Sequence, residues 1–293
     1  MDYHKPERNL VPHPGGIAIL AGLVIPELIL FAITQELGIL AIALTTLIAG
    51  IIGLTDDFRT LGGVIKPLLL IIAALPILIL STYSTILDFP LFGATRLTLI
   101  YPILVLIAIP VTTNTINTID VLNGVVSGFT IIASIPMFIA LVIIGKPIIA
   151  IAMMPLIFAS LAFFIFHRFP SRVFPGDSGT LSLGAMFGAV AIVGGIEVIG
   201  MIAILPAILN SFFFLSSARG FVEHRKIKVR PTVVMDDGRL AAEKSREAPV
   251  TLVRLIVADG PLGEMKIASS IFKLTAFSAI LAIALAFLAW VTF

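Results

Sequence analysis

The sequence contains no cysteine and few charged residues. The lack of cysteine excludes disulfide bonds, thiolate metal ligands and a cysteine nucleophile. Charged residues make up only 12% of the 293 positions, about half of the ~25% that is usual in soluble domains. The net charge is +2, so nothing points to a nucleic-acid partner. Hydrophobic residues fill 59% of the chain instead, which predicts an integral membrane protein surrounded by a lipid bilayer.

Long apolar runs predict the fold. A helix needs about 20 apolar residues to cross the ~30 Å hydrocarbon core of a bilayer. By this criterion we expect an all-α polytopic membrane protein with about nine transmembrane helices in a single domain, residues 1–293. The predicted spans are roughly 15–34, 37–54, 66–83, 97–113, 124–144, 147–166, 179–194, 196–217 and 268–292.

The basic residues predict how these spans are oriented. With a cytoplasmic N-terminus, 17 of the 19 lysines and arginines fall in cytoplasmic segments, and only Arg96 and Lys146 fall outside. The acidic and amide residues gather on the same side. We therefore expect the N-terminus and one active site to face the cytoplasm. Residues 218–267 would form a cytoplasmic substrate-binding loop with a hairpin turn at Asp237–Gly238.

Two adjacent carboxylates, Asp56 and Asp57, stand at the exit of the second span, and Lys66 opens the third. At a helix end both carboxylates can point toward a common site, near a divalent cation or a phosphate-bound lysine. At headgroup depth Lys66 can hold a lipid phosphate. The alternative is an acidic, solvated loop with one more positive-inside lysine, and the motif by itself favours neither interpretation.

Four polar residues recur every three positions after the fourth span: Asn114, Asn117, Asp120 and Asn123. This spacing aligns them on one side of a tight helical turn. Amide oxygens suit hard cations, and amides also read nucleobase edges. The alternative is N-capping of the fifth span with hydrogen bonds between helices. Four such groups in ten residues exceed what capping needs, so we favour a functional role.

Two further segments on this side fit a structural or a functional interpretation equally well. Asp177 can turn the chain and cap the seventh span, or its glycine neighbours can let a phosphate or metal approach the backbone. The basic stretch from Glu223 to Arg230 can anchor the protein to anionic lipid. Alternatively, its His224 and Arg225 can hold a diphosphate.

The order of these motifs resembles the polyprenyl-phosphate N-acetylhexosamine-1-phosphate transferase family, across nearly the whole chain. That family shares a Pro-x-x-Gly segment (here Pro12–Gly15), an Asp-Asp pair with a downstream lysine, an Asn-rich turn and a Gly-Asp turn. Pro170–Asp177 and Leu252–Glu264 look like the branch that makes dolichyl-diphosphate N-acetylglucosamine. The peptidoglycan branch has a His-His pair where this chain offers only His224, which argues against a muramoyl-pentapeptide substrate.

The resemblance implies a Mg²⁺-dependent enzyme, with Mn²⁺ as a substitute. It would move N-acetylglucosamine-1-phosphate from UDP-N-acetylglucosamine to dolichyl or polyprenyl phosphate, as the first membrane step of glycan assembly for protein N-glycosylation. Family members usually have ten spans, so we expect a shorter member or a start upstream of Met1. The branch similarity favours an archaeal source, and a homodimer is compatible with it.

The resemblance also implies roles, residue by residue. It assigns Asn117 and Asp177 to the metal, Lys66 with Asp56 and Asp57 to catalysis, and Asp2, His13, Lys66, Asn114, Asn123, Phe174, Glu223, His224 and Arg225 to the substrates. Two positions depart from the dolichol branch, since Glu223 replaces an arginine and Asp120 fits the bacterial pattern better. An aspartate can remove a proton from the lipid phosphate, or only organise Lys66 and the metal.

Two other functions fit parts of the pattern. The same chemistry with another UDP-N-acetylhexosamine would serve a cell-surface polymer. A transporter of lipid or sugar phosphates would also need several spans with intramembrane prolines. Transporters, however, usually carry polar groups near the bilayer midplane in repeated halves, and this sequence has no visible repeat.

Overall fold

The computed structural model describes residues 12, 15–89, 93–218 and 229–292. Within them the chain forms eleven helices and two short antiparallel hairpins. The helices are α1 (Gly16–Thr34), α2 (Leu37–Phe58), α3 (Ile65–Ile79), α4 (Tyr101–Thr118), α5 (Val125–Ile143), α6 (Pro147–His167), α7 (Gly176–Gly194), α8 (Glu197–Ala203), α9 (Leu205–Ala218), α10 (Leu252–Ile256) and α11 (Glu264–Thr292). The hairpins are β1 (Ile86–Phe89) with β2 (Gly93–Arg96), and β3 (Thr232–Val234) with β4 (Leu240–Ala242).

Each predicted span falls on a helix or on a pair of helices. Among the described residues, six helices (α1, α2, α5, α6, α7 and α11) are long and apolar enough to cross a membrane. The chain is thus an all-α polytopic membrane protein, as the sequence predicted. α3 is shorter than predicted, with 15 residues, because the chain turns at Ser81, whose φ is +51°.

The eighth predicted span, 196–217, is not one continuous helix. It is divided into α8 and α9, which meet at 71°. Pro206, the second residue of α9, has no backbone N–H and cannot extend the hydrogen-bond ladder of α8, whereas the first turn of a new helix tolerates proline. Counted as one bent span, the pair raises the membrane-crossing helices among the described residues to seven.

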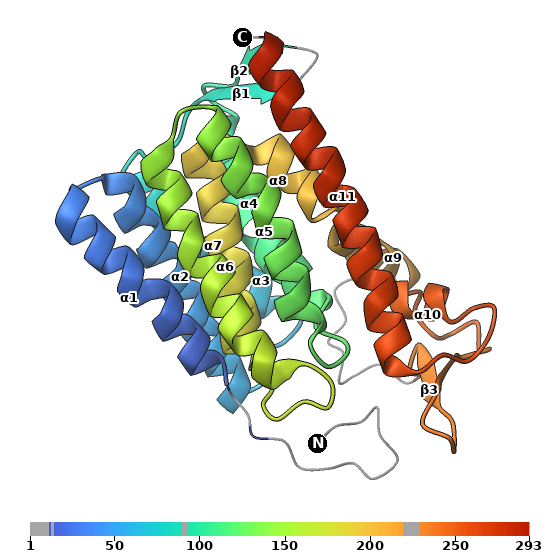
Figure 1. The fold of residues 1–293 in the computed structure, drawn as a ribbon. Helices are drawn as coiled ribbons and strands as arrows, with labels where there is room; N and C mark the ends of the chain where they lie inside the picture. Colours follow the sequence, from blue (N-terminus) through green and yellow to red (C-terminus); the bar gives the residue numbers. More distant parts are fainter. Residues whose placement is uncertain (1–11, 13–14, 90–92, 219–228, 293) are drawn as a thin grey trace.

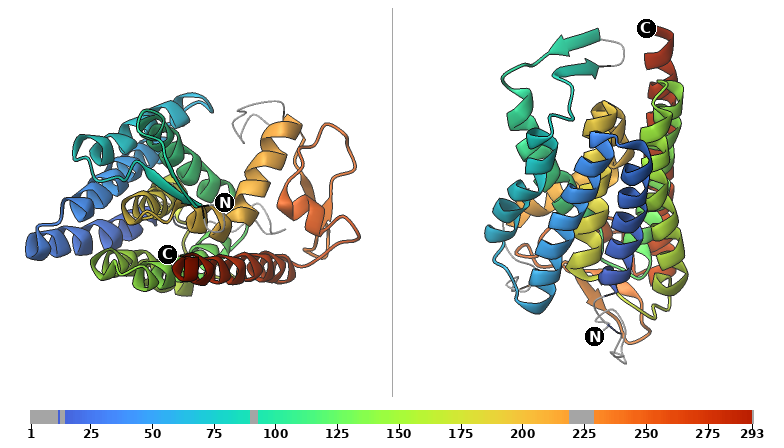
Figure 2. Two further views of the ribbon diagram at one scale, coloured as in Figure 1. Left: turned by 90° about the horizontal axis from the view of Figure 1, so that it is seen from above. Right: turned by 90° about the vertical axis from the view of Figure 1, so that its left-hand side faces the viewer.

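Helix α7 lies amid the other helices, as Figures 1 and 2 show. Sixteen of its 19 residues are buried. Glycines let its neighbours approach closely, since a Cβ on Gly53 of α2 would lie 2.3 Å from the carbonyl oxygen of Asp177, and one on Gly184 would lie 2.6 Å from Cα of Thr113 in α4. The first turn of α7 and the end of α2 are thereby held together.

The two hairpins lie at opposite ends of the bundle (Figure 1). β1 and β2 lie at the end where α11 finishes, and β3, β4 and α10 lie at the end where α1 begins. Gly238 takes a φ of +78° in the β3–β4 connection, which confirms the predicted turn at Asp237–Gly238. Arg254 of α10 holds the loop between β4 and α10 by donating hydrogen bonds to the carbonyl oxygens of Glu243 (2.8 Å) and Ser245 (3.0 Å).

Candidate active site

A cavity of about 970 Å³ gathers the predicted polar residues from five parts of the chain: α2, α3, α4, the turn after α4 and α7. Its charged, amide and imidazole lining residues are Asp56, Asp57, Lys66, Asn114, Asn117, Asp120, Asn123, His167 and Asp177, with Phe174 beside them. All eight of the predicted site residues that the structure describes line this cavity. The other predicted residues, Asp2, His13, Glu223, His224 and Arg225, lie outside the described residues.

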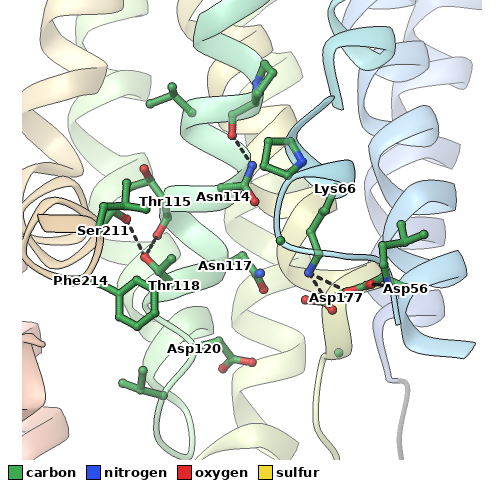
Figure 3. A pocket seen from close by; sticks show the side chains of 18 of the residues that line it. Asp56, Lys66, Asn114, Thr115, Asn117, Thr118, Asp120, Asp177, Ser211 and Phe214 are labelled. Atoms are coloured by element: carbon green, nitrogen blue, oxygen red, sulfur yellow. Dashed lines mark hydrogen bonds and ion pairs between the residues drawn. The ribbon is translucent and has the colours of Figure 1, made fainter. Parts of the chain in front are cut away.

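Lys66, in the first turn of α3, joins the carboxylates of two other helices (Figure 3). Its Nζ lies 2.6 Å from Oδ2 of Asp56 and 3.0 Å from Oδ2 of Asp177. Asp56 also accepts a hydrogen bond from the backbone N–H of Leu61, which closes the loop between α2 and α3. The ammonium group is therefore held in place from both sides, and its side chain is 15% exposed toward the cavity.

Asp57 caps α7 from the neighbouring helix. Its two carboxylate oxygens accept hydrogen bonds from the backbone N–H groups of Asp177 (2.8 Å) and Ser178 (3.0 Å). These N–H groups have no acceptor within their own helix, and the positive end of the helix dipole favours a carboxylate there. The predicted alternative, in which Asp177 caps its own helix, is wrong because α7 already begins at Gly176, and Pro175 at the N-cap position makes no side-chain cap bond.

The Asn-rich segment presents its side chains along one side of the cavity, although not as one continuous helix. The end of α4 tightens as predicted, with the N–H of Asp120 donating to the carbonyl oxygen of Asn117 at 3.2 Å. α4 ends at Thr118, however, so Asp120 and Asn123 lie in the turn that follows. Asn114, Asn117 and Asp120 follow one another opposite Lys66 and Asp177 in Figure 3.

Hydrogen bonds fix two of these amides. Oδ1 of Asn117 accepts a hydrogen bond from the hydroxyl of Thr180 at 2.6 Å, which ties α4 to α7 beside Asp177. Nδ2 of Asn114 donates to the carbonyl oxygen of Pro110 at 2.8 Å. Both contacts orient an amide whose helix already lies against the cavity.

His167 is a cavity residue that the sequence motifs did not reveal. It is 1% exposed, with Nδ1 3.0 Å from the Ser127 hydroxyl and Nε2 3.8 Å from a carboxylate oxygen of Asp120. The ring of Phe174 stands edge-on to it, at 6.4 Å between centroids. Burial, and next the charge of Asp177, raise the pKa of Asp120 to about 7. The one available signal was a histidine at the polar end of an apolar run, directly before Arg168.

The chemistry of the lining fits a hard divalent cation. Four of the described lining residues are acidic and one, Lys66, is a lysine, so negative charge is in excess. Carboxylate and amide oxygens are the ligands that Mg²⁺ and Mn²⁺ prefer. Among the described residues, no three His, Asp or Glu side chains are grouped closely enough to hold a metal by themselves. A cation at Asp177 would therefore also need amide oxygen, such as that of Asn117, or the oxygens of a bound phosphate.

The cavity continues from its charged end into an apolar groove between α3, α4 and α9. The groove is lined by Leu68, Ile71, Leu106, Ile107, Val111, Ile208, Phe212 and Leu215. Several of these side chains are open to the surroundings of the bundle, among them Phe212, which is 63% exposed. The cavity thus has the shape and polarity to receive an amphiphile that has an anionic head and an apolar chain.

Comparison with known proteins places this site in a family. The profile of glycosyl transferase family 4 matches residues 39–195, a range that includes every polar cavity residue from Asp56 to Asp177. The chain is similar to a protein of Saccharolobus solfataricus provisionally named UDP-N-acetylglucosamine–dolichyl-phosphate N-acetylglucosaminephosphotransferase, with 28% identity over 97% of this chain and 87% of that protein.

Two further relatives widen the comparison. The protein of Sulfolobus acidocaldarius with the same provisional name is 28% identical over 96% of this chain and 86% of its own. A phospho-N-acetylmuramoyl-pentapeptide-transferase of Moorella thermoacetica is 30% identical over 64% of this chain and 63% of its own. These matches confirm the resemblance inferred from the order of the motifs. The chain belongs to glycosyl transferase family 4, and it is a multi-pass membrane transferase.

Proposed function

We propose that this protein transfers N-acetylglucosamine-1-phosphate from UDP-N-acetylglucosamine to a dolichyl or polyprenyl phosphate and releases UMP. The observation that carries the proposal is the single cavity that joins Lys66, between two carboxylates, to an apolar groove along α9. The names of the two archaeal relatives contain both substrates, which supports this choice of donor and acceptor.

The reaction needs little covalent chemistry from the protein. An oxygen of the lipid phosphate attacks the β-phosphorus of the nucleotide sugar, and the bond from that phosphorus to the oxygen bridging to the α-phosphate breaks. UMP leaves with the bonding electrons. When the lipid phosphate is fully ionised, reactants and products carry the same total charge, so no proton has to move. Catalysis then consists of holding two anions together and stabilising the charge on the transferred group.

The contacts of each residue suggest its role in this reaction. Lys66 is placed to orient the attacking phosphate, and Asp56 holds Lys66 at 2.6 Å. Because Asp56 also accepts the N–H of Leu61, we favour an organising role for it over that of a base. Asp57 positions Asp177 by fixing the first turn of α7.

Asn117 and Asp177 are the residues that would hold Mg²⁺ or Mn²⁺. When bound, the cation supplies positive charge for the diphosphate oxygens. Asn114, Asn123 and Phe174 line the same cavity, so they are placed to contact the nucleotide sugar. We also propose that this end of the bundle faces the cytoplasm, where nucleotide sugars are soluble, as the distribution of lysine and arginine indicates.

The proposal is tested with purified protein, Mg²⁺, a polyprenyl phosphate and a panel of UDP-sugars labelled in the sugar. We expect labelled lipid and UMP in equal amounts with UDP-N-acetylglucosamine, and no product when a chelator replaces Mg²⁺. Product with another UDP-N-acetylhexosamine alone would overturn the choice of donor. No product with any donor would overturn the function.

A further inference from the structure

The turn that carries Asp120 and Asn123 is held at both ends by hydrogen bonds to side chains that do not line the cavity. At one end, Nδ2 of Asn210 in α9 donates to the carbonyl oxygen of Thr118 at 3.0 Å. At the other, Oε1 of Glu264, the first residue of α11, accepts the backbone N–H of Asn123 at 2.7 Å. Asn210 is 3% exposed and Glu264 is 7% exposed.

The two contacts provide hydrogen-bond partners for two backbone groups, the carbonyl oxygen of Thr118 and the N–H of Asn123. Thr118 ends α4, so its carbonyl oxygen has no partner within the helix, and Asn210 supplies one. Asn123 lies just before α5, where its buried N–H needs an acceptor. A carboxylate is a strong acceptor for such a group, stronger than a neutral oxygen.

The same two side chains connect the turn to the segment between α9 and α11. Oδ1 of Asn210 accepts the N–H of Leu252 at 2.8 Å, which fixes the start of α10. Close before Glu264, the backbone of Leu262 pairs with that of Leu240 in the β3–β4 hairpin. The hairpin, α10 and the turn are thus joined through Asn210 and Glu264.

We infer that Asn210 and Glu264 are positioning residues that set the spacing between Asn117, beside Asp177, and Asn123. The inference rests on the proposed function, because that spacing matters if one substrate reaches both asparagines. A nucleoside diphosphate sugar is long enough to do so, with its phosphates at one end of the turn and its nucleoside at the other. Loosening the Asn123 end then weakens nucleotide binding more than it slows the transfer step.

Conservative variants separate this role from a general loss of structure. Glu264→Gln keeps a carbonyl oxygen for the N–H of Asn123, whereas Glu264→Ala removes the acceptor. Asn210→Asp keeps an acceptor for the N–H of Leu252 but places an oxygen against the carbonyl of Thr118. The matched control is Thr275→Val, also buried in α11, whose hydroxyl bonds the carbonyl oxygen of Ile271 within the same helix.

The experiment measures kcat and KM for UDP-N-acetylglucosamine at saturating lipid phosphate, together with amide hydrogen exchange of residues 119–124. Loss of one hydrogen bond to a charged group predicts that Glu264→Ala raises KM about tenfold with kcat within about twofold. We expect Glu264→Gln and Thr275→Val to stay near wild type, and Asn210→Asp to raise KM. Exchange should quicken in Glu264→Ala and in Asn210→Asp.

Two results would overturn the inference. One is a KM for Glu264→Ala that equals that of Thr275→Val. The other is a Glu264→Gln variant as impaired as Glu264→Ala. If the wild-type protein transfers nothing, the proposed function fails. The exchange measurement still decides whether the side chains of Asn210 and Glu264 hold the turn. Unchanged exchange of residues 119–124 in Glu264→Ala would then refute it.

Discussion

The ammonium group of Lys66 forms ion pairs with two carboxylates, Asp56 and Asp177, from helices that are far apart in the sequence. Asp56 and Asp57 are neighbours in the chain, yet they contact different partners. Asp56 contacts Lys66, and Asp57 contacts the backbone at the start of α7. A single Asp-Asp motif therefore contains one residue that holds a charge and one that caps a helix.

This division predicts different effects of two substitutions. Asp57→Ala removes the cap of α7 and should lower the free energy of unfolding by about 1 kcal/mol, with a lower melting temperature. Asp177→Asn keeps the N–H that Asp57 accepts, so it should leave the melting temperature nearly unchanged while transfer falls by about 100-fold or more. Thermal unfolding in detergent and the transfer assay measure both quantities. Equal losses of stability in the two variants would contradict the assignment of the cap.

The pH dependence of transfer by an Asp56→Asn variant tests the role of Asp56. As an organiser of Lys66, Asp56 is needed at every pH, so transfer by Asp56→Asn should stay low from about pH 6 to pH 8.5. If Asp56 instead removed a proton from the lipid phosphate, higher pH would supply the ionised phosphate and restore turnover. The pH profile of kcat for Asp56→Asn, relative to wild type, distinguishes the two.

Residue roles could be predicted where a local sequence pattern indicates them, but not where they depend on a contact between positions far apart in the chain. Lys66, Asn117 and Asp177 stand out because polar groups are rare in an apolar chain, and all of them line the cavity. The partners of Asn210 and Glu264 could not be predicted, because Glu264 meets a residue 141 positions away and Asn210 meets one 92 positions away. Nothing in the local pattern shows such a contact.

At the scale of elements, the break between α8 and α9 shapes the groove. The sequence predicted one straight span over 196–217, because its apolar run is continuous and a single proline does not fix an angle. α9 instead leaves the direction of α8 at 71°, and its Ile208, Phe212 and Leu215 line the cavity together with residues of α4. The extents of α1, α2, α5 and α6 were predicted closely, since length and hydropathy suffice for unbroken helices.

A bulkier side chain in the apolar groove tests whether the groove binds the lipid chain. Ile107 and Ile103 are one turn apart on α4, and both are more than half exposed, but only Ile107 lines the cavity. Ile107→Trp should displace contacts worth about two methylene groups of the lipid chain and raise KM for polyprenyl phosphate about tenfold. KM for UDP-N-acetylglucosamine should not change. Equal effects of Ile107→Trp and the control Ile103→Trp would argue against a lipid groove.

The whole molecule has two unlike ends, and the lack of cysteine makes their orientation measurable. Ala94, in β2, and Glu247, between β4 and α10, are both exposed. β2 and α10 lie at opposite ends of the bundle (Figure 1). In intact cells, a membrane-impermeant maleimide should label Ala94→Cys and spare Glu247→Cys, because we place the second end in the cytoplasm. Inverted vesicles should give the reverse. Labelling of Glu247→Cys in intact cells would contradict the proposed orientation.

The central claim is that the sugar moves together with its phosphate. UDP-N-acetylglucosamine labelled with ³²P in the β-phosphate tests this directly with purified protein and polyprenyl phosphate. The proposed reaction predicts that the label enters the organic phase with the lipid, that unlabelled UMP appears in equal amount, and that Asp177→Asn lowers both by about 100-fold or more. Label retained in UDP while the sugar enters the lipid would show transfer of the sugar alone and would contradict the account.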